Sequence, residues 1–268
     1  GYLGAIEAFS FYEPVFHAVP LEEDGPDLAV FESVIRDHAP RLFYGIPNSQ
    51  NPSGTTYSDR KRRAVAEILE GSETVFYEDD AFGELFFDGR PRMPVKRYIP
   101  EQTLISGSFS KIIAPGMRIG WIYAPAPILR EFNLAKQAAD LHSNLLCQVI
   151  LNRYLRTHDL DGHVRRVAAV YGEHCRLMCD LLDDLMPAGM THTRPEGGMF
   201  LTAALPRGVS SMEVFHEGVR EGVAVLPGVP FYVDGGGKET IRLNFSAVGA
   251  EEIVEGMHRL ARVMHRLV

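Results

Sequence analysis

One lysine lies among small hydroxyl residues and one arginine lies seven residues further on, and together they could hold a phosphorylated aldehyde. Lys111 follows the segment Ser106–Ser110, and Arg118 comes later between apolar neighbours. A lysine and an arginine are rarely placed inside the edge of a hydrophobic α/β core without a task. The amine of Lys111 could form an imine with an aldehyde, while the serine hydroxyls and the Arg118 guanidinium could hold a phosphate.

Two further polar segments each follow a strand-like run. Asn48–Gly54 could contribute to a site, although its Asn, Pro, Ser and Gly residues are equally typical of a plain turn. Glu78–Phe82 brings three carboxylates that could bind a metal, cap a helix or face water. No histidine lies close by in the sequence to complete a transition-metal site, so a structural loop is the default interpretation of the acidic segment.

Arg242 interrupts an apolar run, Thr240–Phe245, that is typical of a strand. Two interpretations stay open. The arginine could lie on an edge strand and face solvent, or its planar guanidinium could bind a substrate carboxylate with two hydrogen bonds.

The elements that must position these residues alternate between helix and strand in the first half of the chain. The expected helices are Tyr2–Phe11, Asp27–His38 and Asp59–Glu70. The expected strands are Val15–Val19, Arg41–Ile46, Thr74–Tyr77, Thr103–Ile105 and Ile119–Tyr123. This alternation predicts a largely parallel sheet covered on both faces. The polar segments then fall at the carboxyl ends of strands, where ligands gather in α/β sheets.

The second half begins with helical periodicity from Ile128 to about Leu185, interrupted near His158–Gly162. The elements expected after it are a strand at Gly198–Ala203, a helix at Ser211–Glu221, strands at Val223–Leu226 and Thr240–Phe245, and a helix from Ala250. We therefore expect a large domain over residues 1–150, and a linking helix with a small α+β domain over residues 151–268.

Composition excludes some classes of function. A net charge of −8 argues against a nucleic-acid surface, and we interpret the densest basic run, Arg60–Arg63, as the solvated face of a helix. Three sparse cysteines favour buried thiols in a reducing compartment. No apolar run reaches the roughly 18 residues of a membrane span, and no signal peptide is visible. We expect a cytoplasmic protein that binds neither nucleic acid nor membrane.

Taken together, the motifs resemble those of class I and II aminotransferases, which are enzymes of fold type I that depend on pyridoxal 5'-phosphate (PLP). The motifs that carry this likeness are, in chain order, Asn51–Pro52–Ser53–Gly54, Asp79-x-x-Phe82, Ser108-x-Ser110–Lys111, Arg118 and Arg242. More narrowly, the chain is similar to the branch that contains 2-aminoadipate and kynurenine aminotransferases and the aminotransferase-like half of MocR-type regulators. The segments that carry the narrower likeness are Glu78–Phe82, Ala114–Trp121, Asp140–Ser143 and Leu226–Gly228.

The resemblance implies an α/β protein of PLP-dependent transferase fold type I, with a mostly parallel mixed sheet in the large domain and a small α+β C-terminal domain. It implies that Lys111 forms a Schiff base with PLP and then moves the substrate proton, and that Asp79 keeps the pyridine nitrogen protonated. The further cofactor ligands that it implies are Tyr2 on the pyridine ring, Asn51 on the phenolic oxygen, Phe82 beside it, and Ser108, Ser110 and Arg118 on the phosphate. Arg242 and Asn51 are implied to bind the substrate, Arg242 through its α-carboxylate.

Two departures from the family pattern carry expectations of their own. Phe82 stands where the family usually has a tyrosine that donates to the phenolic oxygen, and its loss should raise the pKa of the Schiff base. The family also has about a hundred more residues ahead of the position of Tyr2, including a helix start that holds the phosphate. We therefore expect that this chain is part of a longer polypeptide.

The function expected from the resemblance is transfer of an amino group from an L-amino acid to a 2-oxo acid. The partners implied are these substrates and a second copy of the chain, because sites of this family lie at a twofold interface. Two alternatives stay open: a fold type I PLP enzyme with another reaction type, or the PLP-binding sensor domain of a MocR-type transcription regulator. The branch suggests a long acidic, aromatic or aliphatic substrate, by analogy alone.

Overall fold

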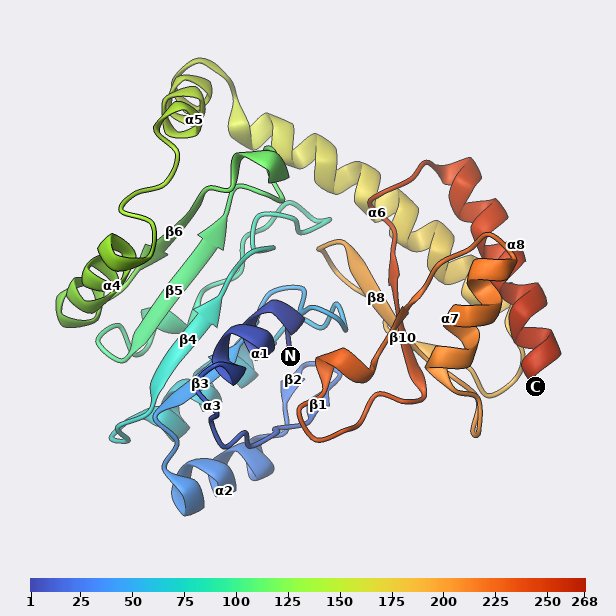
Figure 1. Cartoon of the computed structure of the whole chain (residues 1–268), viewed down its shortest axis with the longest axis horizontal. Helices are drawn as coiled ribbons and strands as arrows, with labels where there is room; N and C mark the ends of the chain where they lie inside the picture. Colours follow the sequence, from blue (N-terminus) through green and yellow to red (C-terminus); the bar gives the residue numbers. More distant parts are fainter. The chain divides into compact units, whose positions relative to one another are not determined.

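The computed structural model describes all residues from Gly1 to Val268, which form two compact units (Figure 1). One unit, here called the Lys111 unit, comprises Val19–Asn48 and Tyr57–Ala168. The other, here called the Arg242 unit, comprises Gly1–Ala18, Ser49–Thr56 and Ala169–Val268. The division of the chain at residue 150 stays a prediction.

The Lys111 unit contains a four-stranded sheet in the order β3-β4-β5-β6. Its strands are β3 (Leu42–Gly45), β4 (Val75–Asp79), β5 (Thr103–Ser108) and β6 (Gly120–Tyr123). The first three strands run parallel, and β6 is antiparallel to β5. The prediction of a mostly parallel mixed sheet is therefore confirmed. The carboxyl ends of β4 and β5 lie side by side, because Asp79 pairs with Ser106.

Two capped helices pack on this sheet. Asp27 caps α2 (Leu28–His38) and Ser58 caps α3 (Asp59–Leu69), each through a side-chain oxygen that accepts backbone N–H groups. Their apolar faces form a core with Phe76 of β4. The remaining elements of this unit are β1 (Leu21–Glu22), β2 (Gly25–Pro26), η1 (Val95–Arg97), η2 (Pro115–Met117), α4 (Ala126–Ala139) and α5 (Leu145–Thr157).

The basic run Arg60–Arg63 is not the uniformly solvated face that the sequence predicted. Lys61 and Arg62 are buried, with exposed fractions of 2% and 0%. Arg62 lies on the same helical stripe as Val65 and Leu69, which carry the apolar face of α3. The interpretation was therefore wrong for these two side chains, whereas Arg60 and Arg63 do face solvent.

The Arg242 unit contains an antiparallel sheet in the order β7-β8-β10-β9. Its elements are α1 (Leu3–Ser10), the part of α6 (Leu160–Leu185) that follows Ala168, β7 (Thr191–His192), β8 (Phe200–Ala204), α7 (Ser211–Arg220), β9 (Leu226–Pro227), η3 (Val229–Phe231), β10 (Thr240–Asn244) and α8 (Ala250–Leu267). Arg242 pairs with Thr202 on one side and Leu226 on the other. Because β10 is an internal strand, the interpretation of Arg242 as an edge-strand residue is wrong.

Two other predictions about elements fail. Val15–Val19 forms no strand, because it finds no partner strand and most of its side chains are exposed. The long helical region breaks at Asp140–Asn144 as well as near His158. The strand predicted at Val223–Leu226 is found only at its last residue, because β9 comprises Leu226–Pro227. The other predicted helices and strands are present with small shifts at their ends. No helix combines the length and the apolar composition that crossing a bilayer requires.

Candidate functional site

A half-buried carboxylate, that of Asp79, lies at the carboxyl end of β4. Successive side chains of a strand point to opposite faces, so Tyr77 and Asp79 lie on one face and Glu78 on the other. The hydroxyl of Tyr44 on the neighbouring strand β3 donates a 2.6 Å hydrogen bond to Oδ2 of Asp79. Burial raises the pKa of the Asp79 carboxyl, while the donors Tyr44 and the Ala81 N–H oppose this rise. A carboxylate in such surroundings is suited to pair with one cationic or protonated ligand atom.

Tyr44 is a site residue that the sequence analysis missed. In an apolar strand, an aromatic residue is interpreted as part of the core. One signal in the sequence distinguished Tyr44: it and Tyr77 occupy equivalent positions near the ends of two consecutive predicted strands. In the structure they are paired in register, with the ring centroids 5.3 Å apart and edge to face.

The end of β5 carries a cluster of hydroxyls around a guanidinium. The Ser110 backbone N–H donates to Oγ of Ser108 at 3.2 Å. Nη1 of Arg118 donates to Oγ of Ser110 at 3.2 Å and to the carbonyl of Pro115 at 3.1 Å. Arg118 adopts a left-handed backbone conformation, with φ at 53°, where η2 ends. The structure thus brings together all three residues that were predicted to hold a phosphate.

Lys111 lies in the turn directly after this cluster. The turn is closed by hydrogen bonds from the N–H groups of Ile113 and Ala114 to the carbonyl of Phe109. Lys111 is half-buried, and its neighbour Ile112 is buried. Lys111 therefore follows β5, as Asp79 ends β4, at the carboxyl edge of one sheet. Phe82 lies in the turn after β4 and is buried, so that turn offers a ring where a tyrosine would offer a hydroxyl.

The Arg242 unit holds a second cluster around the guanidinium of Arg242. Nη1 of Arg242 donates a 2.9 Å hydrogen bond to Oδ1 of Asn51, which is itself buried. The guanidinium carbon lies 4.0 Å from the ring centroid of Phe200 and 5.2 Å from that of Phe231. Burial lowers the pKa of Arg242, and Tyr2 opposes this effect. No carboxylate of the chain forms an ion pair with the group, and a guanidinium can bind a carboxylate through two parallel hydrogen bonds.

The loop that carries Asn51 is anchored by residues far along the chain. Thr193 donates from Oγ1 to the carbonyl of Ser53 at 2.6 Å, and Thr202 donates to the carbonyl of Pro52 at 3.0 Å. Gly54 has a φ of +76°, and a Cβ there would lie 2.5 Å from Pro195. Only glycine fits this backbone without strain.

Tyr2 precedes α1 and is partly exposed, and its ring lies over Gly4. It is near enough to Arg242 to affect the charge of that group. The predicted residues Tyr2, Asn51 and Arg242 are thus neighbours within one unit, as Asp79, Phe82, Ser108, Ser110, Lys111 and Arg118 are parts of the other.

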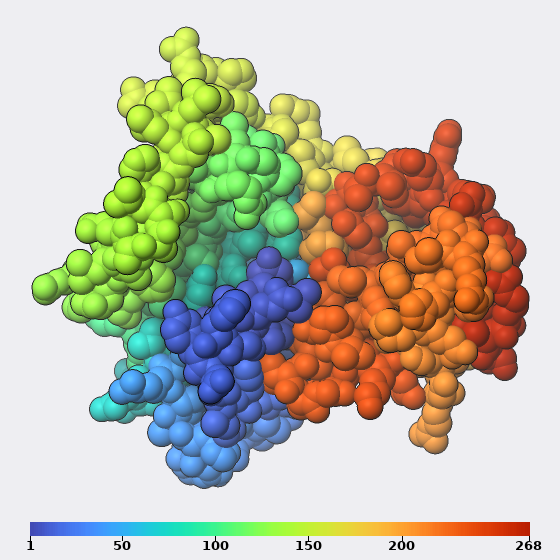
Figure 2. All heavy atoms as spheres, in the orientation of Figure 1, coloured from blue at the N-terminus to red at the C-terminus, as the bar shows by residue number.

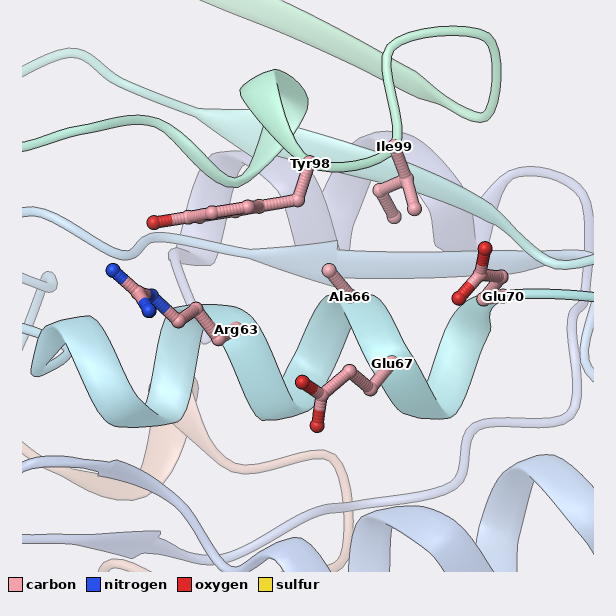
Figure 3. Close-up of a pocket in the computed structure, with 6 residues that line it drawn as sticks. All are labelled: Arg63, Ala66, Glu67, Glu70, Tyr98 and Ile99. Carbon is pink, nitrogen blue, oxygen red and sulfur yellow. The ribbon is translucent and has the colours of Figure 1, made fainter.

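Neither a metal site nor a surface pocket next to α3 adds a further candidate site to these two clusters. No group of His, Cys, Asp and Glu side chains could hold a metal ion. A pocket of about 260 Å³ lies between α3 and the segment after η1 (Figure 3). Its lining residues are Arg63, Ala66, Glu67, Glu70, Tyr98 and Ile99. None of them is a predicted site residue, and its charged groups are on the exposed side of α3.

Comparison with known proteins gives a consistent result. The family model for aminotransferase class I and II matches residues 16–260. Aromatic-amino-acid aminotransferase 1 of Thermococcus litoralis is 37% identical over 269 residues, which cover 98% of this chain and 64% of that protein. The crystal structure of LysN, an alpha-aminoadipate aminotransferase from Thermus thermophilus, has a TM-score of 0.95 and 37% identity, and the match covers 99% of this chain and 69% of that chain.

A regulator is also similar, at lower identity. The uncharacterized HTH-type transcriptional regulator YisV of Bacillus subtilis is 26% identical, over 100% of this chain and 55% of the regulator. The chain spans about two thirds of the length of the aminotransferases that it matches, 64% in one case and 69% in another. Because the structural likeness extends over nearly the whole chain, the predicted fold class, fold type I, is confirmed.

Proposed function

Because the chain belongs to the family of class I and II aminotransferases, we propose that it binds PLP and transfers an amino group from an L-amino acid to a 2-oxo acid. The observation that carries this proposal is the edge of the sheet at β4 and β5. There, the half-buried carboxylate of Asp79 lies on the strand next to the one that leads into Lys111 and into the cluster around Arg118. This donor set matches the three chemical parts of PLP.

The residues of the Lys111 unit fit the cofactor one part at a time. The Lys111 amine would hold the cofactor at its aldehyde group, and the same amine would be the base for the substrate Cα proton. Asp79 accepts a hydrogen bond from the pyridine N–H and keeps that nitrogen protonated. Ser108, Ser110 and Arg118 hold the phosphate, since their Oγ and Nη atoms already lie within hydrogen-bonding distance of one another's groups. When bound, PLP supplies an electron sink for the charge that develops on the substrate.

The residues of the Arg242 unit serve the substrate and the rest of the cofactor. Arg242 binds the substrate α-carboxylate, because it is a partly buried cation held by two rings and by Asn51, with no carboxylate partner in the chain. Asn51 contributes to the same contact and to the phenolic oxygen of PLP. Tyr2 would stack on the pyridine ring. Phe82, which belongs to the Lys111 unit, would contribute to the same cofactor at the phenolic oxygen. The similar aminotransferases are named for aromatic amino acids and for alpha-aminoadipate, so we propose a long aromatic or acidic substrate, with a long aliphatic one as the further candidate.

We also propose a homodimer. The apolar side chains that support it are exposed on β6, α4, the following loop and α5, where Figure 2 shows both helices at the surface. They are Trp121, Ile122, Tyr123, Leu129, Phe132, Leu134, Leu141, Leu145, Leu146, Val149, Ile150 and Leu155. Many exposed apolar side chains on consecutive elements of a folded chain are typical of a protein contact.

We propose that the protein is cytoplasmic. The three cysteines are free thiols, which supports this proposal.

Transamination is favoured over the regulatory alternative by the comparisons. Identity to the aminotransferases is 37%, against 26% to the regulator. The Arg242 cluster also favours an amino-acid substrate, since an unpaired guanidinium serves carboxylate recognition. PLP chemistry of another reaction type uses the same residues and becomes an outcome of the test.

The test is the absorption spectrum of the purified protein with PLP, before and after adding a panel of L-amino acids, in the wild type and in Lys111→Ala. We expect a visible band that requires Lys111 and that aromatic or long acidic amino acids bleach, with 2-oxo acids restoring it. A Lys111-dependent band that no amino acid converts would reject transamination in favour of a sensor or of other PLP chemistry. A wild-type protein that develops no band at all would reject PLP binding by this chain.

A further inference from the structure

A fully buried arginine lies behind the sheet edge that carries Asp79. Arg62 on α3 has no exposed surface, and the proposed function gives it no role. Its guanidinium makes four hydrogen bonds, three of them to backbone carbonyls and one to a side-chain amide. A buried cation is costly to desolvate, so its retention inside the core calls for a physical reason.

The first set of contacts fixes both ends of the loop that carries Asn51. Nε of Arg62 donates to the carbonyl of Tyr57 at 2.9 Å, and Nη2 donates to the carbonyl of Pro47 at 3.0 Å. The N–H of Tyr57 also donates to the carbonyl of Pro47 at 2.8 Å. Pro47 and Tyr57 flank the loop in sequence. One guanidinium therefore holds Pro47 and Tyr57, the residues at the two ends of the loop, together with the backbone hydrogen bond between them.

The second set of contacts reaches the turn after Asp79. Nη2 of Arg62 donates to Oδ1 of Asn48 at 2.6 Å, and Nδ2 of Asn48 donates to Oδ1 of Asp80 at 2.6 Å. Asp80 also accepts the N–H of Gly83, and a Cβ at residue 83 would overlap the Asp80 carboxylate. Asn48 thus connects Arg62 by hydrogen bonds to a tight turn. The first residue of this turn, Asp80, directly follows Asp79.

The charge of Arg62 also acts on two carboxylates on this side of the sheet. Glu78 and Asp80 flank Asp79 in the chain; Glu78 is fully buried, and Asp80 is half-buried. Glu78 accepts the N–H groups of Val95 and Lys96 at 3.0 and 2.9 Å. Burial raises the pKa of Glu78 and of Asp80, and the positive charge of Arg62 opposes this rise at both carboxyls.

We propose that Arg62 is a positioning residue of the PLP site: it fixes both ends of the loop bearing Asn51 and, through Asn48 and Asp80, the turn that holds Asp79 against the pyridine nitrogen. This inference rests on the proposed function, because it assigns a role in the same site. Arg62 contacts neither cofactor nor substrate, so its effect is exerted entirely through the residues that it holds.

The chain offers a matched control on the same helix. Lys61 is equally buried and cationic, and Nζ of Lys61 donates to the carbonyl of Pro26 at 2.7 Å and pairs with Glu22, away from Asn48 and Asp80. Arg62→Lys keeps the charge but loses the planar fork, and Asn48→Ala cuts the link to Asp80 and leaves Arg62 in place. Lys61→Met removes a comparable buried cation that contacts neither the ends of the loop bearing Asn51 nor the turn after Asp79.

Three quantities are measured for each purified variant: the thermal unfolding midpoint without cofactor, the Kd for PLP from an absorbance titration, and the pH midpoint of the visible band. All three variants are expected to unfold at lower temperature than the wild type. Only Arg62→Lys and Asn48→Ala should weaken PLP binding, by roughly 10-fold or more. Loss of a residue that orients a ligand-binding side chain has an effect of this size at metal sites. Their band midpoints should move in the same direction as in Asp79→Asn, because both changes weaken protonation of the pyridine nitrogen.

The outcomes separate this inference from the proposed function. If wild-type protein shows no Lys111-dependent band, the proposed function fails, and the positioning role falls with it. If the wild type shows the band, and Arg62→Lys and Asn48→Ala bind PLP with the wild-type Kd and midpoint, only the positioning role is overturned. The positioning role is likewise overturned if Lys61→Met changes Kd and midpoint as much as Arg62→Lys does.

Discussion

Tyr44 on β3 donates a 2.6 Å hydrogen bond to the carboxylate of Asp79 at the end of β4. Removing this donor in Tyr44→Phe leaves the ring and takes away one of the contacts that favour the ionised acid. A hydrogen bond to a charged group contributes about 1.5–3 kcal/mol, so the rate of amino transfer should fall roughly 10- to 100-fold. The measurement is kcat with a saturating amino acid. Tyr77→Phe, which loses only a 3.2 Å contact with Ser106, is the control and should stay within about 2-fold; equal losses in both variants would contradict the assignment.

Replacing Arg242 by lysine should weaken substrate binding more than the chemical step. Lysine keeps the charge but cannot lie flat on Phe200 while offering two parallel N–H donors to a carboxylate. We expect KM for the amino acid to rise about 10- to 100-fold, with a smaller change in kcat. Steady-state kinetics measure both, and Arg220→Lys on the exposed end of α7 is the control. An unchanged KM would show that the carboxylate binds elsewhere.

Restoring a hydroxyl at position 82 should shift the titration of the bound cofactor. Phe82 is buried in the turn after β4 and offers no donor. In Phe82→Tyr, a donor to the phenolic oxygen stabilises its anionic form, so the pH midpoint of the visible band should fall. A spectrophotometric pH titration of both proteins with PLP decides the matter. Superimposable titrations would show that a hydroxyl at this position does not reach the phenolic oxygen.

His192 should make stability depend on pH. Burial disfavours the charged ring, but hydrogen bonds to the carbonyl of Thr193 and the carboxylate of Asp183, at 3.0 and 2.8 Å, outweigh it and raise the pKa of His192. Because the folded-state pKa is the higher one, this contribution to stability is complete below about pH 6.5, the value for an unfolded chain. It is lost as pH rises through the folded-state pKa.

The change that tests this contribution is His192→Gln, followed by the thermal unfolding midpoint between about pH 5 and pH 8. The wild type should lose stability relative to the variant as pH increases across this window. His258→Gln, at an exposed position of α8, should run parallel to the wild type. A constant difference between wild type and His192→Gln at every pH would show that the ring acts through packing alone.

The arrangement of strands and helices was largely predictable, because it depends on local periodicity and capping. Asp27 and Ser58 precede apolar helical stripes, and both cap helices in the structure. The strand expected at Val15–Val19 failed for the opposite reason. Whether an apolar run becomes a strand depends on a partner, and the partner is a property of the whole fold.

In the candidate site, residues with a conspicuous chemical group could be predicted from the sequence. Residues that only their position in the fold brings to the site could not. Lys111, Arg118 and Arg242 are conspicuous because charged groups are rare in apolar surroundings. Tyr44 is indistinguishable in sequence from a core aromatic until the register of β3 and β4 is known. Arg62 could have been found, since it continues the stripe of Val65 and Leu69 on α3, but its position in a basic run concealed this.

The contact between Asn51 and Arg242 joins residues 191 positions apart, and this has a consequence during synthesis on the ribosome. At about 5–20 residues per second, the loop bearing Asn51 waits roughly 10–40 s before the strand that anchors it is made. Strands β4, β5 and β6 of the Lys111 unit are translated during that interval, and β3 precedes it. The nascent chain should therefore acquire protease-resistant structure in that sheet first, with Arg242 and Asn51 among the last groups to be fixed.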